Sequence, residues 1–308
     1  MNACVRAVVR TALHHGMEVY GIMRGYSGMI KGEFVKLDSS SVSNILQRGG
    51  TMLKSARSPE FHTWTGRQQA YMQLVNKGIE GLVAIGGNGT FTGAMLFEEE
   101  FGLPTVGAPG TIDNDLYGTD FTIGYDTAVN TALESIDKIR DTADSHDRAF
   151  FVEVMGRDSG YIALPCAVGG GAEIVLVPEH EQSIESIIDL LQAGRRRQKS
   201  SFLVVVAEGE VEGHAAMVAQ QVRQAIPELD VRVTVMGHIQ RGGAPSAADR
   251  LLASQLGVAA VEGLRAGQRN VMAGIVNHGL VYTPFHDCIH RKKTLNPSLL
   301  DLVDLLAV

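Results

Sequence analysis

Residues 82–90 have the sequence LVAIGGNGT, and this stretch predicts the fold of the chain. Residues 82–85 form a short apolar run that is typical of a buried strand. The next five residues, 86–90, are mostly glycine, and a helical pattern begins near Phe91. A buried strand that passes through glycines into a helix is the repeating unit of a parallel sheet covered by helices.

The same alternation continues along the chain. Further short apolar runs predict strands at 19–23, 105–108, 149–155, 174–178, 202–207, 231–236 and 272–276. Apolar side chains at helical spacing lie between them, within 128–139, 184–191 and 252–264, and we interpret these stripes as core packing. We therefore predict an α/β protein with two similar three-layer α/β/α domains and mostly parallel sheets.

Length, composition and charge narrow the class of protein. A chain of 308 residues with 45% hydrophobic residues is long enough for two cores. The net charge of -7 argues against a protein that binds nucleic acid through its overall charge, because a negative surface repels the phosphate backbone. The three cysteines fit neither a disulfide framework nor a zinc site. No apolar run approaches the roughly 20 residues of a membrane span, and the first residues do not resemble a signal peptide, so we expect a cytoplasmic protein without a membrane partner.

In open parallel sheets, ligands bind beyond the carboxyl ends of the strands. The glycines of 86–90 let backbone N–H groups approach an anion at the start of a helix, which favours a phosphate site. A structural turn that needs positive φ would use the same glycines. Residues 109–115 follow another predicted strand, and their two carboxylates, Asp113 and Asp115, suit a general base beside a cation. An ordinary Asx turn explains them equally well.

Two further segments carry arginines beside glycines. Residues 155–157 end in Gly156 and Arg157, with Arg148 just before the strand that leads to them. Residues 237–243 include His238, Arg241 and paired glycines, with Arg232 near the start of their strand. The planar guanidinium group of arginine donates paired hydrogen bonds to phosphate oxygens, so both segments suit an anion site. A lone histidine at a strand end, however, is more often a structural residue. The basic segment 194–199 is better explained by a solvated helix end than by an anion site.

Taken together and in this order, these segments resemble the ATP-dependent 6-phosphofructokinases, which phosphorylate fructose 6-phosphate at its 1-hydroxyl. The resemblance covers nearly the whole chain and includes 49–61, 86–90, 109–115, 155–157, Glu208 and 237–243. It implies that Asp113 accepts the proton of the sugar 1-hydroxyl, that Thr111 and Asp115 position the substrate and magnesium, and that Arg157 steadies the transferring phosphate. Phosphoryl transfer requires mainly alignment, charge stabilisation and such a base.

The resemblance also implies the binding residues. The substrate-binding set comprises Thr111, Ile112, Asp113, Arg148, Met155, Gly156, Arg157, Glu208, Arg232, His238, Ile239, Gln240 and Arg241. Met155 and Glu208 would hold the sugar. His238 and Arg241 would hold its 6-phosphate, together with Arg148 and Arg232 from a neighbouring subunit of a homotetramer. The nucleotide-binding set comprises Arg57, Ser58, Phe61, Gly86, Gly87, Asn88, Gly89 and Thr90, with Mg²⁺ held by Asn88 and Asp115.

Gly89 and Gly110 favour ATP as phosphoryl donor. Relatives that use pyrophosphate usually carry Asp and Lys at these two positions, so the pyrophosphate-dependent enzyme is the alternative. Asn88 departs from the family's usual Asp and brings no negative charge to the metal. NAD and lipid kinases share a similar glycine-rich loop but lack the other motifs.

An allosteric site is also implied, between subunits. Its aligned residues are Arg6, Arg10, Arg140, Gly171, Glu173, Arg197 and Lys199. Ser39 stands where a further Arg is typical, so one phosphate contact is missing from this predicted site.

The resemblance finally implies how the chain divides into domains and that one segment of the family's fold is absent. We expect 1–124 with 240–290 to form the ATP-binding domain, and 125–239 with 291–308 to form the fructose 6-phosphate-binding domain. Residues 1–3 correspond to the end of the family's first glycine-rich turn, so the opening strand and turn, about 15 residues, are expected to be absent. We favour a late start site as the explanation. The other explanation is a shortened, catalytically impaired sugar-phosphate-binding or regulatory subunit.

Overall fold

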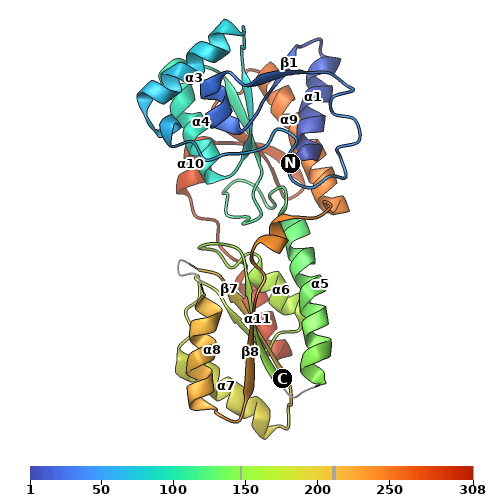
Figure 1. The fold of residues 1–308 in the computed structure, drawn as a ribbon, viewed down its shortest axis with the longest axis vertical. Helices are drawn as coiled ribbons and strands as arrows, with labels where there is room; N and C mark the ends of the chain where they lie inside the picture. Colours follow the sequence, from blue (N-terminus) through green and yellow to red (C-terminus); the bar gives the residue numbers. More distant parts are fainter. Residues whose placement is uncertain (146–147, 210–212, 308) are drawn as a thin grey trace. The chain divides into compact units, whose positions relative to one another are not determined.

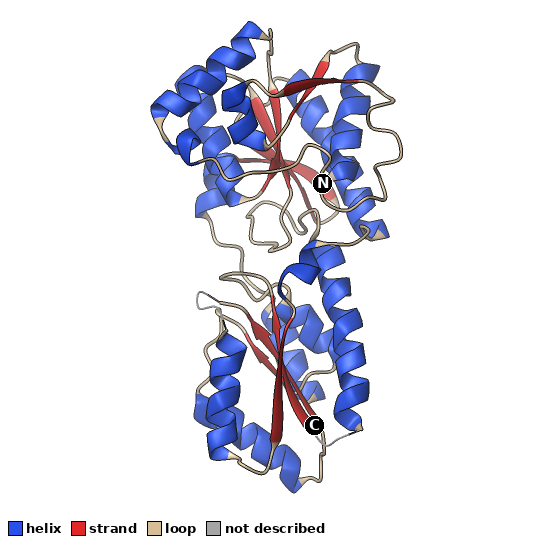
Figure 2. Cartoon of the chain, in the orientation of Figure 1, coloured by secondary structure: helices blue, strands red, loops and turns tan. Residues whose placement is uncertain are grey.

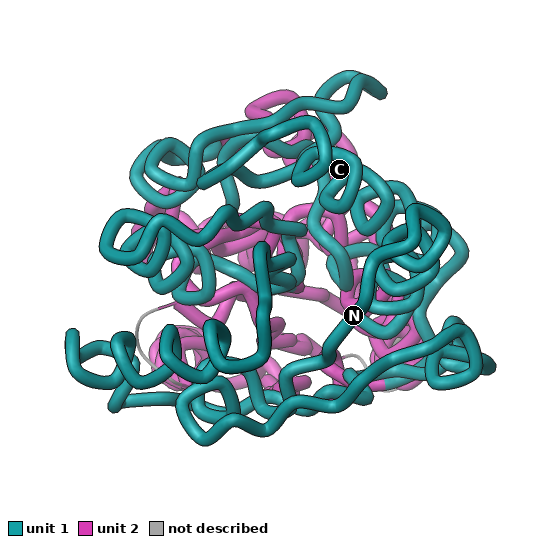
Figure 3. The backbone as a smooth tube through the Cα atoms, turned by 90° about the horizontal axis from the view of Figure 1, so that it is seen from above, with its two compact units in different colours: residues 1–111, 116–126, 243–293 teal, residues 112–115, 127–242, 294–308 magenta. Residues whose placement is uncertain are grey.

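A computed structural model describes residues 1–145, 148–209 and 213–307. The chain forms two compact units, each made of separate stretches of sequence (Figure 3). The first unit contains 1–111, 116–126 and 243–293, and the second contains 112–115, 127–242 and 294–308. Each unit has its own sheet and its own helices (Figures 1 and 2).

The first unit is built on a four-stranded sheet in the order β10-β9-β4-β3. Its strands are β3 (Leu82–Gly86), β4 (Thr105–Pro109), β9 (Val271–Val276) and β10 (Gly279–Pro284). β3, β4 and β9 run parallel, whereas β10 pairs antiparallel with β9. The predicted strands at 82–85, 105–108 and 272–276 are confirmed, and β10 is an additional strand that was not predicted.

Helices cover both faces of this sheet. α1 (Asn2–His14) and α9 (Ala247–Arg265) pack together on one face, where Ala273 of β9 joins their apolar side chains. α4 (Asn88–Phe101) and α10 (Phe285–His290) contribute to the cluster around Met272. Neighbouring residues of a strand point to opposite faces, so Met272 and Ala273 mark the two sides of a three-layer arrangement.

A small second sheet lies in the same unit. β1 (Val19–Ile22) pairs antiparallel with β2 (Phe34–Leu37), and α2 (Gly25–Lys31) connects them. The strand predicted at 19–23 therefore exists, but it belongs to a two-stranded antiparallel sheet and not to the parallel sheet. Apolar periodicity reports burial and does not identify the partner strand. η1 (Pro59–His62) and α3 (Trp64–Asn76) complete this region.

The second unit has a four-stranded parallel sheet in the order β6-β7-β5-β8. Its strands are β5 (Arg148–Val154), β6 (Ile174–Leu176), β7 (Phe202–Ala207) and β8 (Asp230–Val235). α7 (Ile184–Arg196) and α8 (His214–Ala225) bury one face, while α5 (Tyr125–Asp144), α6 (Ala163–Gly170) and α11 (Pro297–Leu306) lie on the other (Figure 1). The strand predicted at 174–178 ends at Leu176, before Pro178, which has no N–H for a ladder hydrogen bond.

The α/β class and the two three-layer units agree with the prediction. Residues 112–115 are grouped with the second unit, whereas the predicted division placed them with residues 1–124. Their packing explains this, because the Ser159 hydroxyl of the second unit donates to the Asp113 carbonyl. Among the described residues, no helix is long and apolar enough to cross a membrane.

Candidate active site

Predicted site residues gather at the carboxyl ends of three adjacent strands of the second unit. Met155 follows β5, Glu208 follows β7, and η2 (Gly237–Arg241) follows β8. These strands are neighbours in the order β7-β5-β8, so the segments beyond them lie at one edge of the sheet. This edge is where ligands bind in open parallel sheets.

Asp113 is buried at this edge and contacts the turn after β5. Its Oδ2 atom lies 3.5 Å from Nε of Arg157, and its carbonyl oxygen accepts a hydrogen bond of 3.1 Å from the Ser159 hydroxyl. The Asp113 side chain is 5% exposed, whereas that of Arg157 is 66% exposed. The arrangement fixes a carboxylate beside a guanidinium group that solvent and ligands can reach.

The turn after β5 has a backbone that few residue types adopt. Gly156 has φ of 147°, and a Cβ atom at this position would lie 2.6 Å from the carbonyl oxygen of Ser159. Arg157 and Asn114 have φ of 51° and 52°, in the left-handed region. Unfavourable backbone conformations of this kind cluster at functional sites because the surrounding structure must hold them in place.

Two hydrogen bonds tie this turn to the neighbouring strands. The Arg157 N–H donates to Oε1 of Glu208 at 2.9 Å, and the Met155 N–H donates to Oε1 of Gln240 at 2.8 Å. Gln240 is 1% exposed, so its side chain is held inside the unit. His238 and Ile239 are exposed beside it. The structure thus brings together Asp113, the turn after β5, Glu208 and η2, with Arg241 also exposed at the end of η2.

Arg148 and Arg232 lie at the other end of the same sheet. Arg148 is the first residue of β5, and the strand extends for about 20 Å before the turn that holds Arg157. Both arginines pair with Asp230: Arg148 Nε lies 2.8 Å from its Oδ2 atom, and Arg232 Nε lies 2.9 Å from its Oδ1 atom. Within one chain, these two arginines are therefore separated from the other predicted substrate-binding residues.

The glycine-rich segment of the first unit joins β3 to α4. Gly86 ends the strand, and Asn88 begins a helix of 14 residues. The first turn of a helix carries backbone N–H groups without intrahelical partners and so attracts anions. A Cβ atom at Gly89 would have nothing within 4 Å, whereas one at Gly87 would lie 3.3 Å from Cβ of Thr111.

An aromatic pair flanks this segment. The Tyr26 and Phe61 rings stack with their centroids 3.9 Å apart, and the Tyr26 hydroxyl donates to the carbonyl oxygen of Thr90 at 2.5 Å. Burial raises the pKa of Tyr26, so its hydroxyl stays protonated as a donor. Ser58 precedes η1, Phe61 lies within it, and Arg57 is exposed before Ser58. Tyr26 was not predicted, because its contact with Thr90 joins residues 64 positions apart.

Oxygen ligands for Mg²⁺ are available in both units, as a carboxylate at Asp115 and an amide at Asn88. Among the described residues, no group of three or more His, Cys, Asp or Glu side chains is arranged to hold a metal ion. Mg²⁺ commonly takes one or two protein oxygens and completes its shell with phosphates and water, so the side-chain oxygen of either residue suits the ion. Burial, Glu179 and Asp115 together raise the pKa of Tyr161 to about 12.

Most of the predicted allosteric residues have protein partners. Arg140 Nη1 donates to the carbonyl oxygens of Gly170 and Gly171, and Lys199 lies 2.7 Å from Oε1 of Glu173. Arg197 is exposed after the end of α7. Arg6 and Arg10 belong to α1 in the first unit. The second unit therefore groups Arg140 with Gly171, and Glu173 with Lys199.

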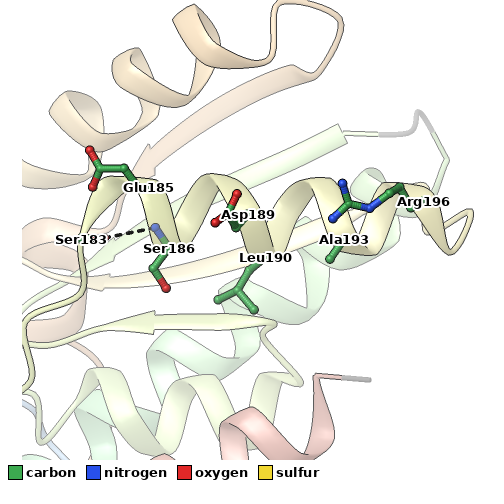
Figure 4. A pocket seen from close by; sticks show the side chains of 7 residues that line it. All are labelled: Ser183, Glu185, Ser186, Asp189, Leu190, Ala193 and Arg196. Carbon is green, nitrogen blue, oxygen red and sulfur yellow. Dashed lines mark hydrogen bonds between the residues drawn. The ribbon is translucent and has the colours of Figure 1, made fainter.

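The side chains that line two surface hollows of the second unit are not among the predicted site residues. One follows α7 and is lined by Ser183, Glu185, Ser186, Asp189, Leu190, Ala193 and Arg196 (Figure 4). The other lies among β6, the end of β7 and α8. Its lining includes Asp158, the neighbour of Arg157, but none of the predicted site residues.

A family model described as phosphofructokinase matches residues 1–264, which is most of the chain. The chain belongs to the phosphofructokinase family. The predicted family and fold class are thereby confirmed.

Named relatives also match this chain closely in sequence. The ATP-dependent 6-phosphofructokinase of Cytophaga hutchinsonii is 60% identical over 306 residues, covering 99% of this chain and 93% of the relative. The ATP-dependent 6-phosphofructokinase 1 of Thermus thermophilus is 56% identical over 308 residues, covering 100% of this chain and 95% of the relative.

Solved phosphofructokinase structures share the fold. The crystal structure of Pichia pastoris phosphofructokinase is 35% identical with a TM-score of 0.89, and it matches the whole of this chain. This chain spans 36% of the length of that protein. A pyrophosphate-dependent phosphofructokinase from Marinobacter aquaeolei is 23% identical with a TM-score of 0.83, over 99% of this chain and 88% of that one, and this likeness concerns the fold alone.

Proposed function

We propose that this chain transfers the γ-phosphoryl group of ATP to the 1-hydroxyl of fructose 6-phosphate, giving fructose 1,6-bisphosphate and ADP. The observation that carries the proposal is the buried Asp113 carboxylate beside Arg157, at the carboxyl ends of the strands. The names of relatives that are 60% and 56% identical support ATP as the donor.

In this proposal, Asp113 is the general base. The Ser159 hydroxyl holds its main chain, so the carboxylate is positioned before the substrate binds. The carboxylate accepts the proton of the sugar 1-hydroxyl as the oxygen attacks the γ-phosphorus, and the bond from phosphorus to the β–γ bridging oxygen breaks. Arg157 is exposed next to Asp113 and stabilises negative charge on the transferred group.

The remaining contacts bind the two substrates. Glu208, Met155 and Gly156 hold the sugar, while His238, Ile239 and Arg241 surround its 6-phosphate. Thr111 and Ile112 complete the substrate contacts. The N-terminus of α4 binds the ATP phosphates through Gly86, Gly87, Gly89 and Thr90, and Arg57, Ser58 and Phe61 contact the nucleotide. The first unit thus binds ATP and the second binds fructose 6-phosphate.

Asn88 and Asp115 are the proposed magnesium ligands. When bound with ATP, Mg²⁺ would neutralise negative charge on the phosphates. Asn88 offers a neutral amide oxygen and Asp115 a carboxylate, so this chain contributes one negative charge through these two side chains.

We further propose a homotetramer in which neighbouring subunits share active sites. The length of β5 supports sharing, because it holds Arg148 about 20 Å from the turn with Arg157. Arg148 and Arg232 would then bind the 6-phosphate at a neighbour's site. A cytoplasmic location fits the glycolytic reaction, and ADP or phosphoenolpyruvate would act at Arg6, Arg10, Arg140, Gly171, Glu173, Arg197 and Lys199.

A coupled assay with ATP, Mg²⁺ and fructose 6-phosphate tests the proposal. We expect turnover with ATP and little with pyrophosphate under the same conditions. Turnover with pyrophosphate alone would assign the chain to the alternative donor. Binding of fructose 6-phosphate without turnover from either donor would instead identify a sugar-phosphate-binding or regulatory subunit.

A further inference from the structure

Asp230 joins two arginines that belong to different strands. Arg148 donates from Nε to its Oδ2 atom at 2.8 Å. Arg232 contacts both carboxylate oxygens, with Nε 2.9 Å from Oδ1 and Nη2 3.0 Å from Oδ2. One carboxylate therefore engages two guanidinium groups at once, and its own role is not assigned by the proposed mechanism.

The register of the sheet explains why these side chains meet. Arg148 and Asp230 are paired residues of the parallel strands β5 and β8. Arg232 lies two residues after Asp230, so it projects from the same face of β8. β8 is the outer strand of this sheet in the described part of the chain, which leaves the three side chains partly exposed, at 26%, 44% and 54% for Arg148, Asp230 and Arg232.

We propose that Asp230 is a positioning residue that holds the Arg148 and Arg232 guanidinium groups together as one phosphate-binding pair. The inference rests on the proposed function, in which this pair binds the 6-phosphate of a sugar phosphate at the active site of a second copy of the chain. Two guanidinium groups and one carboxylate leave the group with a net charge of about +1, which still attracts a phosphate dianion.

The contacts of Asp230 bear on whether it orients the two arginines or competes with the phosphate for them. The carboxylate engages Nε of Arg148, and Nε and Nη2 of Arg232. The hydrogen bonds of Asp230 therefore use neither terminal nitrogen of Arg148 nor Nη1 of Arg232, and the proposal assigns these donors to the phosphate. The arginines also hold the pKa of Asp230 below its usual value, so the carboxylate remains charged at neutral pH.

The magnitude follows from side-chain ordering. Immobilising a long side chain on binding costs free energy, and a tenfold change in affinity corresponds to about 1.4 kcal/mol. Removal of Asp230 leaves both arginines to be ordered by the ligand. We therefore expect about a tenfold loss of sugar-phosphate affinity.

Steady-state kinetics of Asp230→Asn and Asp230→Glu in the full chain test this role. For Asp230→Asn we expect KM for fructose 6-phosphate to rise about tenfold, with kcat and KM for ATP within about twofold of the parent. Asp230→Glu keeps the charged anchor and should restore most of the affinity. Glu228→Gln is the matched control: it removes a nearby exposed pair, Glu228 with Arg195 at 2.6 Å, and should leave KM unchanged.

An unchanged or lower KM in Asp230→Asn would overturn the proposal, and a lower value would identify Asp230 as a competitor of the phosphate. A joint fall of kcat and ATP affinity with a lower Tm would also overturn it, in favour of a structural role. If the parent chain shows no turnover, the proposed function fails instead. Calorimetric titration of parent and variant with fructose 6-phosphate then tests the role of Asp230 without turnover. Equal affinities of the two proteins, or no binding to either, would reject the positioning role.

Discussion

Arg157 places its Nε atom 3.5 Å from Oδ2 of Asp113, although the two side chains differ greatly in exposure. The carboxylate is buried and its main chain is held by Ser159, while the guanidinium group is accessible. A general base works best when it is held in position before the reaction. A guanidinium group that stabilises the negative charge of the transferred phosphoryl group must instead be accessible to the ligand. This asymmetry agrees with different roles for the two residues.

Asp113→Asn should lower kcat by about 10² to 10⁴, the usual contribution of a general base, with little change in fructose 6-phosphate affinity. The amide keeps the shape of the side chain but does not accept the hydroxyl proton at neutral pH. Initial-rate kinetics and equilibrium binding separate the two quantities. Asp158→Asn is the control, because Asp158 is an exposed acid in the same turn. Near-normal turnover in Asp113→Asn would remove Asp113 from the role of base.

Ser159→Ala should weaken catalysis through the position of Asp113. The variant loses hydrogen bonds to the carbonyl oxygens of Asp113 and Gly156, which should cost about 1 kcal/mol of unfolding free energy. We expect kcat to fall up to about tenfold because the carboxylate is less well aligned. Ser135→Ala, which removes a hydroxyl bonded to Thr131 within α5, should leave kcat unaffected. Equal kcat values for the two variants would contradict this positioning role.

The strand whose predicted bounds match the structure at both ends is buried on both faces. The apolar run at 202–207 coincides with β7, because a central parallel strand excludes polar side chains from both sides. β10 was missed since it begins with Gly279, ends with Pro284 and has one exposed face, so its apolar pattern is weak. The pairing of β1 with β2 was likewise not encoded in the periodicity of either strand.

Site residues were predictable where they follow a buried strand. Asp113 and Arg157 were proposed as site residues in this way and stay predictions. Ser159 and Asp230 were not proposed, because their contacts join residues 46 and 82 positions apart. The substrate-binding assignment of Gln240 stays a prediction. Its burial and its hydrogen bond to Met155 are tertiary features that its position in the sequence does not reveal.

Asp38 should titrate with a pKa of about 2, lowered from 3.8 by the Ser40 hydroxyl and the Ser41 N–H and hydroxyl. Because the folded pKa is depressed, the stabilising contribution is present above about pH 4 and is lost as the pH falls through 2. Carboxyl ¹³C shifts measured by NMR report the pKa directly. Ser40→Ala should raise it toward 3.8, while Ser43→Ala, whose hydroxyl donates to Ser39, should not. A pKa near 3.8 in the parent protein would refute the network.

Asn88→Asp should lower the Mg²⁺ concentration needed for half-maximal turnover. The substitution adds a negative charge at the first residue of α4, where a carboxylate also interacts favourably with the helix dipole. Titration of turnover with Mg²⁺ at fixed ATP measures the change. Asn76→Asp, at the end of α3, adds the same charge elsewhere in the first unit and serves as control. If the two variants have the same magnesium dependence as the parent, Asn88 is not part of the metal site.

Gly89→Asp should raise KM for ATP by at least about tenfold, since a carboxylate at the start of α4 occupies the space and the positive field meant for a phosphate. Gly89→Ala is the matched control. A Cβ atom at Gly89 meets nothing within 4 Å, so alanine fits and should change KM for ATP much less. Both variants should keep the parent's KM for fructose 6-phosphate. Equal ATP kinetics in Gly89→Asp and the parent would place the nucleotide phosphates away from this helix N-terminus.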